Sequence, residues 1–245
     1  MKKGIIALII IAIIGLAYIT LFNEKKDDNK IIMVTEAGFA PYEYYKGKEI
    51  VGIDVDIANE IAKALGKELE IRDVEFDSIL NEIKFGRGDF AAAGLTITKE
   101  RKEEVDFSDE YTLTKQVIIV REDSDIQTLD DLHGKTASLQ TGSLPDLQVQ
   151  EDFEDVEIIN TSTIYASVED VKTGKVDFTA TDEIPAQNYV KENKGLRILD
   201  ESLVESSFGI AVKKGNKELL EKINEVIKKL KEEGKIEEYL INHTK

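Results

Sequence analysis

The sequence predicts an α/β protein of two lobes, each a mixed and mostly parallel sheet flanked by helices. From residue 31 onward, short apolar runs alternate with amphipathic helical patterns, which is typical of α/β folds. The alternation restarts after about residue 120, and a final strand and helix follow that need an existing sheet to pack against. The chain has 245 residues, which is enough for two lobes of about 100 residues, each with a buried core.

The first lobe opens with alternating strands and helices. Apolar runs predict strands at residues 31–34, 69–74 and 90–93. Between the first two strands, apolar residues recur at helical spacing from Ala58 to Leu65. Asp54 is the expected N-cap of this helix, and Gly66 is placed to end it. A second helix is expected at residues 78–85, before Gly86.

A further strand is expected at residues 116–120, after which the pattern restarts. Apolar runs of the second set predict strands at residues 136–139, 156–159 and 177–179, and a closing strand is expected at residues 208–212. Helical patterns are expected at residues 144–150 and 165–173. A closing helix carries Leu220, Ile223, Ile227 and Leu230 on one face.

The closing strand and helix would complete the first lobe, so the chain would cross between the lobes twice. We expect these crossings near residues 118–123 and 201–207. Two short crossings side by side form a hinge that lets two lobes close over a ligand. The expected division is residues 31–120 with 206–245 in lobe 1, and residues 121–205 in lobe 2.

The N-terminus predicts a secretory signal or membrane anchor with a tether, over residues 1–30. Met1, Lys2 and Lys3 begin the chain, and residues 4–22 are almost wholly apolar. This apolar run is about as long as a spanning helix, which favours an uncleaved anchor over a cleaved signal. Both alternatives place the rest of the chain outside the cytoplasm, either secreted or held at a cell surface or in a periplasm.

Composition excludes several classes of partner and chemistry. The net charge of −17 repels phosphate backbones, so we expect no nucleic-acid partner. The chain has no cysteine, which excludes disulfides, thiolate catalysis and thiolate metal sites.

Motifs for catalysis, metals and cofactors are weak or missing from the sequence. Residues 86–91 match a loose dinucleotide pattern, but the order of helix and strand around them is reversed. His133 and His243 are far apart and read as surface residues. We expect no catalytic residue, no metal site and no cofactor.

One polar segment begins where a parallel strand should end, which is where open α/β sheets bind ligands. In residues 94–101, Thr96 offers a hydroxyl and a backbone N–H. Arg101 lies on the first turn of a helix that Thr98 should cap, and its planar guanidinium matches a carboxylate.

This segment carries a resemblance to a known family. Residues 94–111, GLTITKERKEEVDFSDEY, resemble the signature of the family 3 extracellular solute-binding proteins, which serve polar amino-acid ABC importers. The opening FAPYEY at 39–44 and VGIDVDIA at 51–58 also resemble the family, as do motifs at 129–135, 141–143 and 181–182. The resemblance implies a type II periplasmic-binding-protein fold with a two-strand hinge. It also implies a non-catalytic receptor that works with a membrane permease, and we expect a monomer.

Roles for individual residues follow from the resemblance. It implies that Arg101 and Thr96, helped by the backbone of Gly94 and Ser143, hold the ligand α-carboxylate. It also implies that Asp182 and the Gly94 carbonyl hold the α-ammonium. A buried zwitterion needs both a fixed cation and a fixed anion to offset its desolvation.

The side-chain end of the pocket is less determined. Phe39 and Phe76 resemble the aromatic pair that encloses the ligand side chain in the family. Glu36, Gln140 and Leu144 depart from common family residues and would line the far end. An unpaired buried carboxylate is expensive, which ranks arginine and lysine first, then glutamine or histidine, with glutamate and aliphatic amino acids last.

Two other functions stay open at this point. The same fold also hosts a dehydratase, for which Asp182 and Glu183 are candidate proton donors, and it occurs in sensory modules at the cell surface. The candidate ligand-binding residues are Glu36, Phe39, Phe76, Gly94, Leu95, Thr96, Arg101, Gln140, Ser143 and Asp182.

Overall fold

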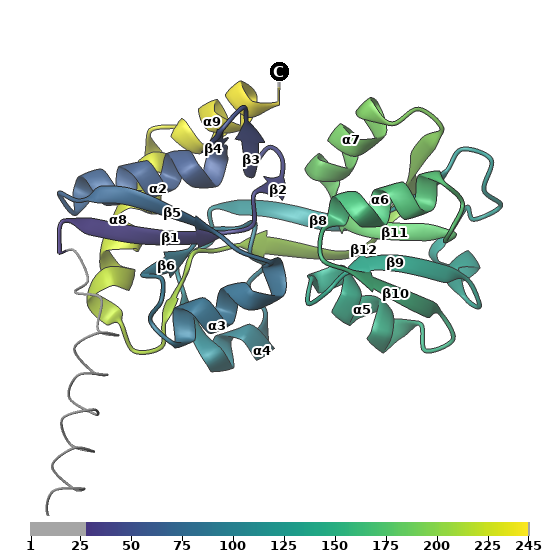
Figure 1. Ribbon diagram of the computed structural model, residues 1–245, viewed down its shortest axis with the longest axis horizontal. Helices are drawn as coiled ribbons and strands as arrows, with labels where there is room; N and C mark the ends of the chain where they lie inside the picture. Colours follow the sequence, from purple (N-terminus) through teal and green to yellow (C-terminus); the bar gives the residue numbers. More distant parts are fainter. Residues whose placement is uncertain (1–27, 245) are drawn as a thin grey trace, which may run out of the picture. The chain divides into compact units, whose positions relative to one another are not determined.

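The computed structural model describes residues 28–244. Within this range the strands form two five-stranded sheets and one three-stranded sheet, covered by helices (Figure 1). The expected signal or anchor at residues 4–22 lies outside the described residues. Between residues 28 and 244, no helix is both long enough and apolar enough to cross a membrane.

The first sheet has the strand order β5-β1-β6-β13-β7. Its strands are β1 Lys30–Thr35, β5 Glu68–Asp73, β6 Phe90–Ala91, β7 Val105–Phe107 and β13 Ala211–Lys213. β1 runs parallel to β6, with Met33 opposite Phe90. β13 runs antiparallel to both β6 and β7. The closing strand therefore joins the sheet that opens the chain.

Helices pack on this sheet through apolar stripes. They are α2 Ile53–Ala64, α3 Ile79–Lys84 (preceded by the 3-10 turn η1 Phe76–Ser78), α4 Lys99–Glu104, α8 Lys217–Glu232 and α9 Lys235–His243. Ile57 and Ile61 of α2 are fully buried in the same cluster as Ile223 and Ile227 of α8. The predicted apolar face of the closing helix is therefore a core face.

The second sheet has the strand order β10-β9-β11-β8-β12. Its strands are β8 Thr112–Arg121, β9 Thr136–Gln140, β10 Glu157–Thr161, β11 Phe178–Asp182 and β12 Leu196–Phe208. β9 is parallel to β10 and β11, whereas β8 is antiparallel to β11 and β12. The helices of this half are α5 Leu144–Asp152, α6 Ile164–Lys172 and α7 Glu183–Glu192. Both sheets are thus mixed.

Two long strands join the halves directly. β8 and β12 pair along most of their length (Figure 1), and the chain passes between the sheets through residues 108–111 and 209–210. The expected crossings near 118–123 and 201–207 differ from these positions, because the strand predicted at 116–120 belongs to the second sheet as part of β8, and β12 extends to Phe208. Residues 112–115 are half-buried or exposed and largely polar, so they carry no apolar signal.

Several elements escaped prediction. A three-stranded sheet of β2 Gly38–Phe39, β3 Glu43–Lys46 and β4 Glu49–Val51 is too short to show a period. The strand expected at 208–212 is two strands, because Phe208 ends β12 and Gly209 and Ile210 precede β13. Asp54 is not the N-cap of α2. Gly52 takes that position, and Asp54 lies inside the first turn, where its carboxylate reaches another loop.

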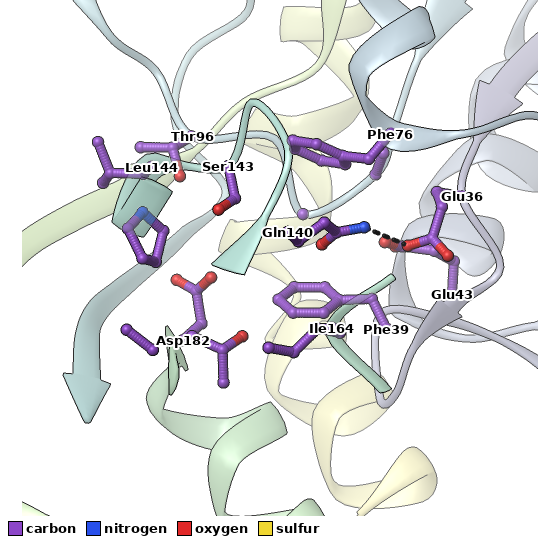
Figure 2. A pocket seen from close by; sticks show the side chains of 15 residues that line it. Glu36, Phe39, Glu43, Phe76, Thr96, Gln140, Ser143, Leu144, Ile164 and Asp182 are labelled. Atoms are coloured by element: carbon purple, nitrogen blue, oxygen red, sulfur yellow. Dashed lines mark hydrogen bonds between the residues drawn. The ribbon is translucent and has the colours of Figure 1, made fainter. Parts of the chain in front are cut away.

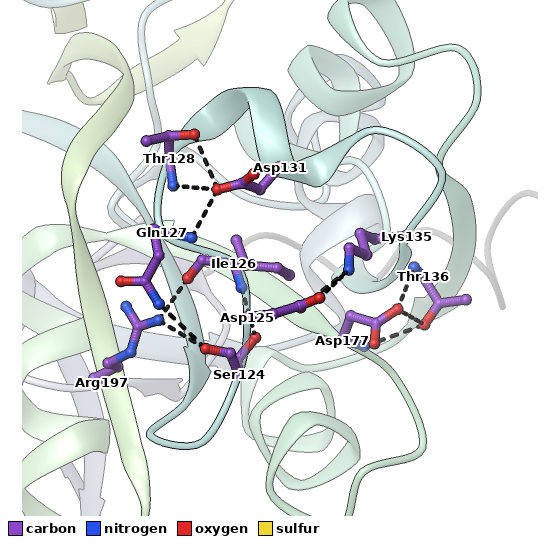
Figure 3. A network of polar contacts seen from close by, with 10 residues as sticks. All are labelled: Ser124, Asp125, Ile126, Gln127, Thr128, Asp131, Lys135, Thr136, Asp177 and Arg197. Atoms are coloured by element: carbon purple, nitrogen blue, oxygen red, sulfur yellow. Dashed lines mark hydrogen bonds and ion pairs between the residues drawn. The ribbon is translucent and has the colours of Figure 1, made fainter.

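The long connection between β8 and β9 is held by polar contacts (Figure 3). The Asp131 carboxylate accepts the backbone N–H groups of Gln127 and Thr128, each at 2.9 Å. The Arg197 guanidinium of β12 donates to the carbonyl of Ile126. These bonds satisfy backbone groups that form no strand pairs, so the connection has a defined path.

The C-terminal helix docks through His243, which is not the free surface residue that the sequence suggests. Its imidazole is largely buried, with Nε2 2.9 Å from Asp56 Oδ2 and Nδ1 3.0 Å from the Tyr44 hydroxyl. These contacts tie α9 to α2 and to β3.

Candidate functional site

A pocket lies where the ends of both large sheets meet the small sheet (Figure 2). Its lining comes from six separate stretches of the chain, between residues 36 and 182. The lining residues are Glu36, Phe39, Glu43, Phe76, Ala93, Gly94, Thr96, Gln140, Ser143, Leu144, Pro145, Ile164, Ala180, Thr181 and Asp182. Strand ends and helix N-termini supply most of them.

The structure brings eight of the ten predicted residues together around this pocket. They are Glu36, Phe39, Phe76, Gly94, Thr96, Gln140, Ser143 and Asp182. Leu95 belongs to an apolar cluster with Ile79 and Ile83, and it borders an adjoining cavity instead of this pocket. Arg101 borders an adjoining cavity together with Phe76 and Gly142.

Six lining residues had no role in the sequence analysis. Four of them, Ala93, Pro145, Ile164 and Ala180, are apolar wall residues next to predicted positions or at helix starts. Glu43 stands in the FAPYEY motif, but nothing in the sequence indicates that its carboxyl turns inward. Thr181 directly precedes Asp182 in β11.

Arg101 links the two halves at the pocket. Thr98 caps α4 by accepting the Arg101 backbone N–H at 3.2 Å, as the sequence predicts. The buried guanidinium donates to the Thr96 carbonyl at 2.8 Å and to the Gly142 carbonyl at 2.9 Å. Burial lowers the pKa of Arg101 to about 10, and the charge of Asp182 opposes that shift. Arg101 therefore remains a cation at neutral pH.

Carboxyl groups dominate the electrostatics of the pocket. Burial raises the pKa of Glu36 to about 7, although a hydrogen bond from Gln140 at 3.4 Å opposes the shift. Burial also raises the pKa of Asp182 to about 7, against a hydrogen bond from Gln116 at 2.6 Å. The pKa of the buried Glu43 carboxyl is raised well above its usual value, by desolvation first and then by the charge of Asp54.

Two loop glycines at the pocket are held in the same way. The Gly94 N–H donates to Asp54 Oδ2 at 2.8 Å, and the Gly142 N–H donates to Asp146 Oδ2 at 2.9 Å. Both glycines have positive φ, 50° and 73°, which side-chain-bearing residues rarely adopt. Each aspartate lies in the first turn of a helix, α2 or α5. A rigid helix thus sets the position of each loop.

Aromatic rings enclose the middle of the pocket. Figure 2 shows the rings of Phe39 and Phe76 on opposite sides of the space that the Gln140 side chain enters. Phe39 is supported from behind by Tyr42 and Phe208, with ring centroids 5.7 and 6.4 Å away. Such rings provide flat faces for an aliphatic chain or for a guanidinium.

The arrangement suits recognition of a small zwitterion better than catalysis. It combines a fixed guanidinium, a fixed carboxylate and flat apolar walls between two separate sheets. Among residues 28–244, no group of His, Cys, Asp and Glu is placed to hold a metal ion. These features define a ligand-binding protein of the type II periplasmic-binding-protein fold.

Comparison with known proteins identifies the family. Residues 31–243 match the bacterial extracellular solute-binding proteins, family 3, and the chain belongs to this family. It is 34% identical over 220 residues to the arginine-binding extracellular protein ArtP of Bacillus subtilis, covering 88% of this chain and 86% of ArtP. It is 31% identical to the glutamine-binding protein GlnH of the same organism, over 87% of this chain and 80% of GlnH.

Solved structures agree with this assignment. An ancestral arginine-binding protein bound to arginine superposes with a TM-score of 0.84 at 36% identity, covering 88% of this chain and 98% of that protein. The substrate-binding protein AbpA of Streptococcus pneumoniae, bound to L-arginine, gives 0.85 at 31% identity, with 88% and 94% covered.

The close approach at Gly94 gives a stability prediction. A Cβ at this position would lie 2.6 Å from Phe39 Cε1, and the φ of +50° disfavours any side chain. We expect Gly94→Ala to lower the free energy of unfolding by about 1–2 kcal/mol for the backbone strain. Overpacking against Phe39 should lower it by a further ~1–3 kcal/mol. Urea unfolding measures the sum.

Gly47→Ala is the matched control. Gly47 has a φ of +68° and nothing within 4 Å of an added Cβ, so only the backbone strain applies. If Gly94→Ala and Gly47→Ala lose the same free energy of unfolding, the close approach of a side chain at residue 94 to Phe39 is contradicted.

Proposed function

We propose that this protein is an extracytoplasmic receptor that closes over arginine, or a closely related cationic amino acid, and delivers it to an ABC importer. The charge balance of the pocket carries this proposal. Glu36, Glu43 and Asp182 line the pocket, whereas Arg101 is the one cation among the buried residues that the structure describes. A ligand with two positive groups and one negative group restores neutrality better than a neutral side chain does.

The backbone end of the ligand would lie between Arg101 and Asp182. Two N–H groups of Arg101 bond to carbonyls, and its remaining N–H groups can receive a carboxylate together with the hydroxyls of Thr96 and Ser143. The α-ammonium would face Asp182 and the Gly94 carbonyl. The placement of these side chains supports the roles.

The side chain of the ligand would extend between Phe39 and Phe76 toward Glu36 and Gln140. Glu36 is 8% exposed, and its hydrogen bond from Gln140 is long at 3.4 Å. A buried carboxylate with so weak a partner is stabilised strongly by an incoming guanidinium. The similarity to proteins described as arginine-binding supports the same choice.

The proposal also covers the closure of two lobes and the location of the protein in the cell. One lobe would surround each large sheet, with β8 and β12 as the two-strand hinge between them. Contacts such as that of Tyr189 with the Gly38 carbonyl, at 2.9 Å, would form on closure. We further propose that the protein acts as a monomer, without catalysis, and that residues 1–30 direct it across the membrane or anchor it there.

A ligand screen tests the function. We expect arginine to raise the melting temperature most among the twenty amino acids, because a ligand at 100 times its dissociation constant adds about 2.7 kcal/mol to stability. Arg101→Ala should abolish this response while the fold persists, since truncating a buried ion pair costs about 3–5 kcal/mol. A response to glutamate or leucine that exceeds the response to arginine would overturn the proposal.

A substitution that removes one negative charge tests the part of the pocket that would hold the ligand side chain. Glu36→Gln keeps the shape of the side chain but removes the negative charge that would face a guanidinium. We expect its arginine affinity in calorimetry to fall by an order of magnitude or more, while glutamine affinity gains relative to arginine. Glu122→Gln, at an exposed position, is the control. An unchanged ranking of ligands in Glu36→Gln would contradict the contact.

The raised pKa values predict how binding depends on pH. Glu36 and Asp182, with pKa values of about 7 in the ligand-free pocket, take up protons as the pH falls through 7. A cationic ligand requires both groups to be ionised, so binding releases protons, and affinity falls with decreasing pH. Each titrating group lowers affinity by up to about tenfold per pH unit below its pKa.

Calorimetry at pH 5.5 and 7.5, in buffers of different ionisation enthalpy, measures both the affinity and the proton release. We expect at least tenfold weaker arginine binding at pH 5.5 than at pH 7.5. In Glu36→Gln, arginine affinity should change less with pH because one titrating group is gone. Proton uptake on binding, or equal affinity at both values, would be inconsistent with the charged pair.

A further inference from the structure

Helix α7 contacts the opposite half of the molecule through two side chains. The Tyr189 hydroxyl donates to the Gly38 carbonyl at 2.9 Å, and the Asn188 amide donates to the Ala40 carbonyl at 3.3 Å. α7 follows β11 of the second sheet, whereas residues 38–40 follow β1 of the first sheet. Both hydrogen bonds therefore join the two halves, and both must break when the halves separate.

The two bonds hold the backbone on both sides of a pocket residue. Phe39 lies between Gly38 and Ala40 and lines the pocket, whereas Asn188 and Tyr189 are not among the lining residues. β2, which contains Phe39, is an edge strand of the small sheet. Carbonyl groups at the edge of a sheet take partners from outside the sheet or from water. α7 supplies such partners when the two halves lie together.

The Tyr189 hydroxyl is a well-defined donor. Its ring packs against the larger apolar core cluster. A tyrosine side chain has few rotatable bonds, so holding its hydroxyl in place loses little conformational entropy. Burial raises the pKa of Tyr189, and the charge of Glu36 adds to this shift. The hydroxyl therefore keeps its proton at neutral pH.

The same helix begins at a pocket carboxylate. Asp182 occupies the N-cap position of α7, and Asn188 and Tyr189 lie in the second half of the helix. Under the proposed function, Asp182 faces the α-ammonium of the ligand. The ligand and the two bonds to the backbone at residues 38–40 thus act on one rigid helix, and each favours the state in which the halves lie together.

We propose that Asn188 and Tyr189 form a latch on the carbonyls of Gly38 and Ala40, and that this latch sets how long a bound amino acid is retained without setting which amino acid is preferred. The inference rests on the proposed function and adds a control of ligand release. A ligand enters while the halves are apart and leaves when they separate again. Because the latch does not touch the ligand, it stabilises the closed state by the same factor for every ligand.

The test measures release and affinity in matched variants. Tyr189→Phe removes one donor of the latch and keeps the ring, and Asn188→Ala removes the other donor. Tyr165→Phe, at a tyrosine of α6 that is 59% exposed, is the control. Release of radiolabelled arginine from the full chain into excess unlabelled arginine measures the dissociation rate. Calorimetry measures the affinities for arginine and for lysine.

We expect Tyr189→Phe to raise the dissociation rate of arginine about three- to tenfold, which corresponds to the loss of one hydrogen bond. The affinities for arginine and lysine should fall by this same factor, while the association rate should change less than about twofold. Asn188→Ala should act in the same direction but less strongly, because its bond is longer. Tyr165→Phe should match the unmodified protein.

Two results of these measurements would overturn the inference. One is an unchanged dissociation rate in Tyr189→Phe, including the case in which its melting temperature falls, because the hydroxyl would then have a structural role alone. The other is a loss of affinity that differs between arginine and lysine, because Tyr189 would then act on the ligand itself.

A distance measurement tests the latch separately from the identity of the ligand. The chain has no cysteine, so cysteines at the exposed positions Lys48, between β3 and β4, and Lys191, in α7, would carry one pair of spin labels across the latch. In a mixture of the standard amino acids, we expect the label distance of the closed state to be less populated in Tyr189→Phe than with Tyr189 present. Equal populations would overturn the inference. Failure of the proposed function gives a different result, in which the unmodified protein binds neither arginine nor lysine.

Discussion

The site depends on one constraint, which is that more negative than positive charge is buried in one small volume. Asp54 and Glu43 are almost completely buried, and Asp182 and Glu36 nearly so, whereas Arg101 is the buried cation that the described structure places among them. Burial disfavours the ionised form of a carboxyl group, which raises the pKa values of Glu36 and Asp182 to about 7. Under the proposed function, a cationic ligand would offset this excess of buried negative charge and stabilise the closed state.

Helices outside the pocket fix the positions of the loops that line it. Asp54 of α2 and Asp146 of α5 each hold the N–H of a glycine in a loop that faces the cavity, one loop from each half. Arg101 then bonds to a carbonyl from each of these loops, at Thr96 and Gly142. The residues that would touch a ligand are therefore oriented by a second layer of buried aspartates.

Sequence reasoning succeeded where a local rule operates and failed where only tertiary packing decides. Apolar periodicity located α2 and α8, and the capping preference of Thr98 placed Arg101 at the start of α4, as the structure shows. Leu95, a candidate from the sequence, lies in a core cluster and borders only the cavity that adjoins the pocket. Strand β12 left no local signal because most of its residues are half-buried or exposed, and the inward turn of Glu43 left none because tertiary packing buries it.

The strand order also has a consequence for the order of assembly. The second sheet uses one continuous stretch, residues 112–208, whereas the first places β13 between β6 and β7. The first sheet therefore cannot close its central gap until β13, at residues 211–213 of 245, is available, and its loop-closure entropy is correspondingly larger. The second sheet, by contrast, needs no residue beyond 208.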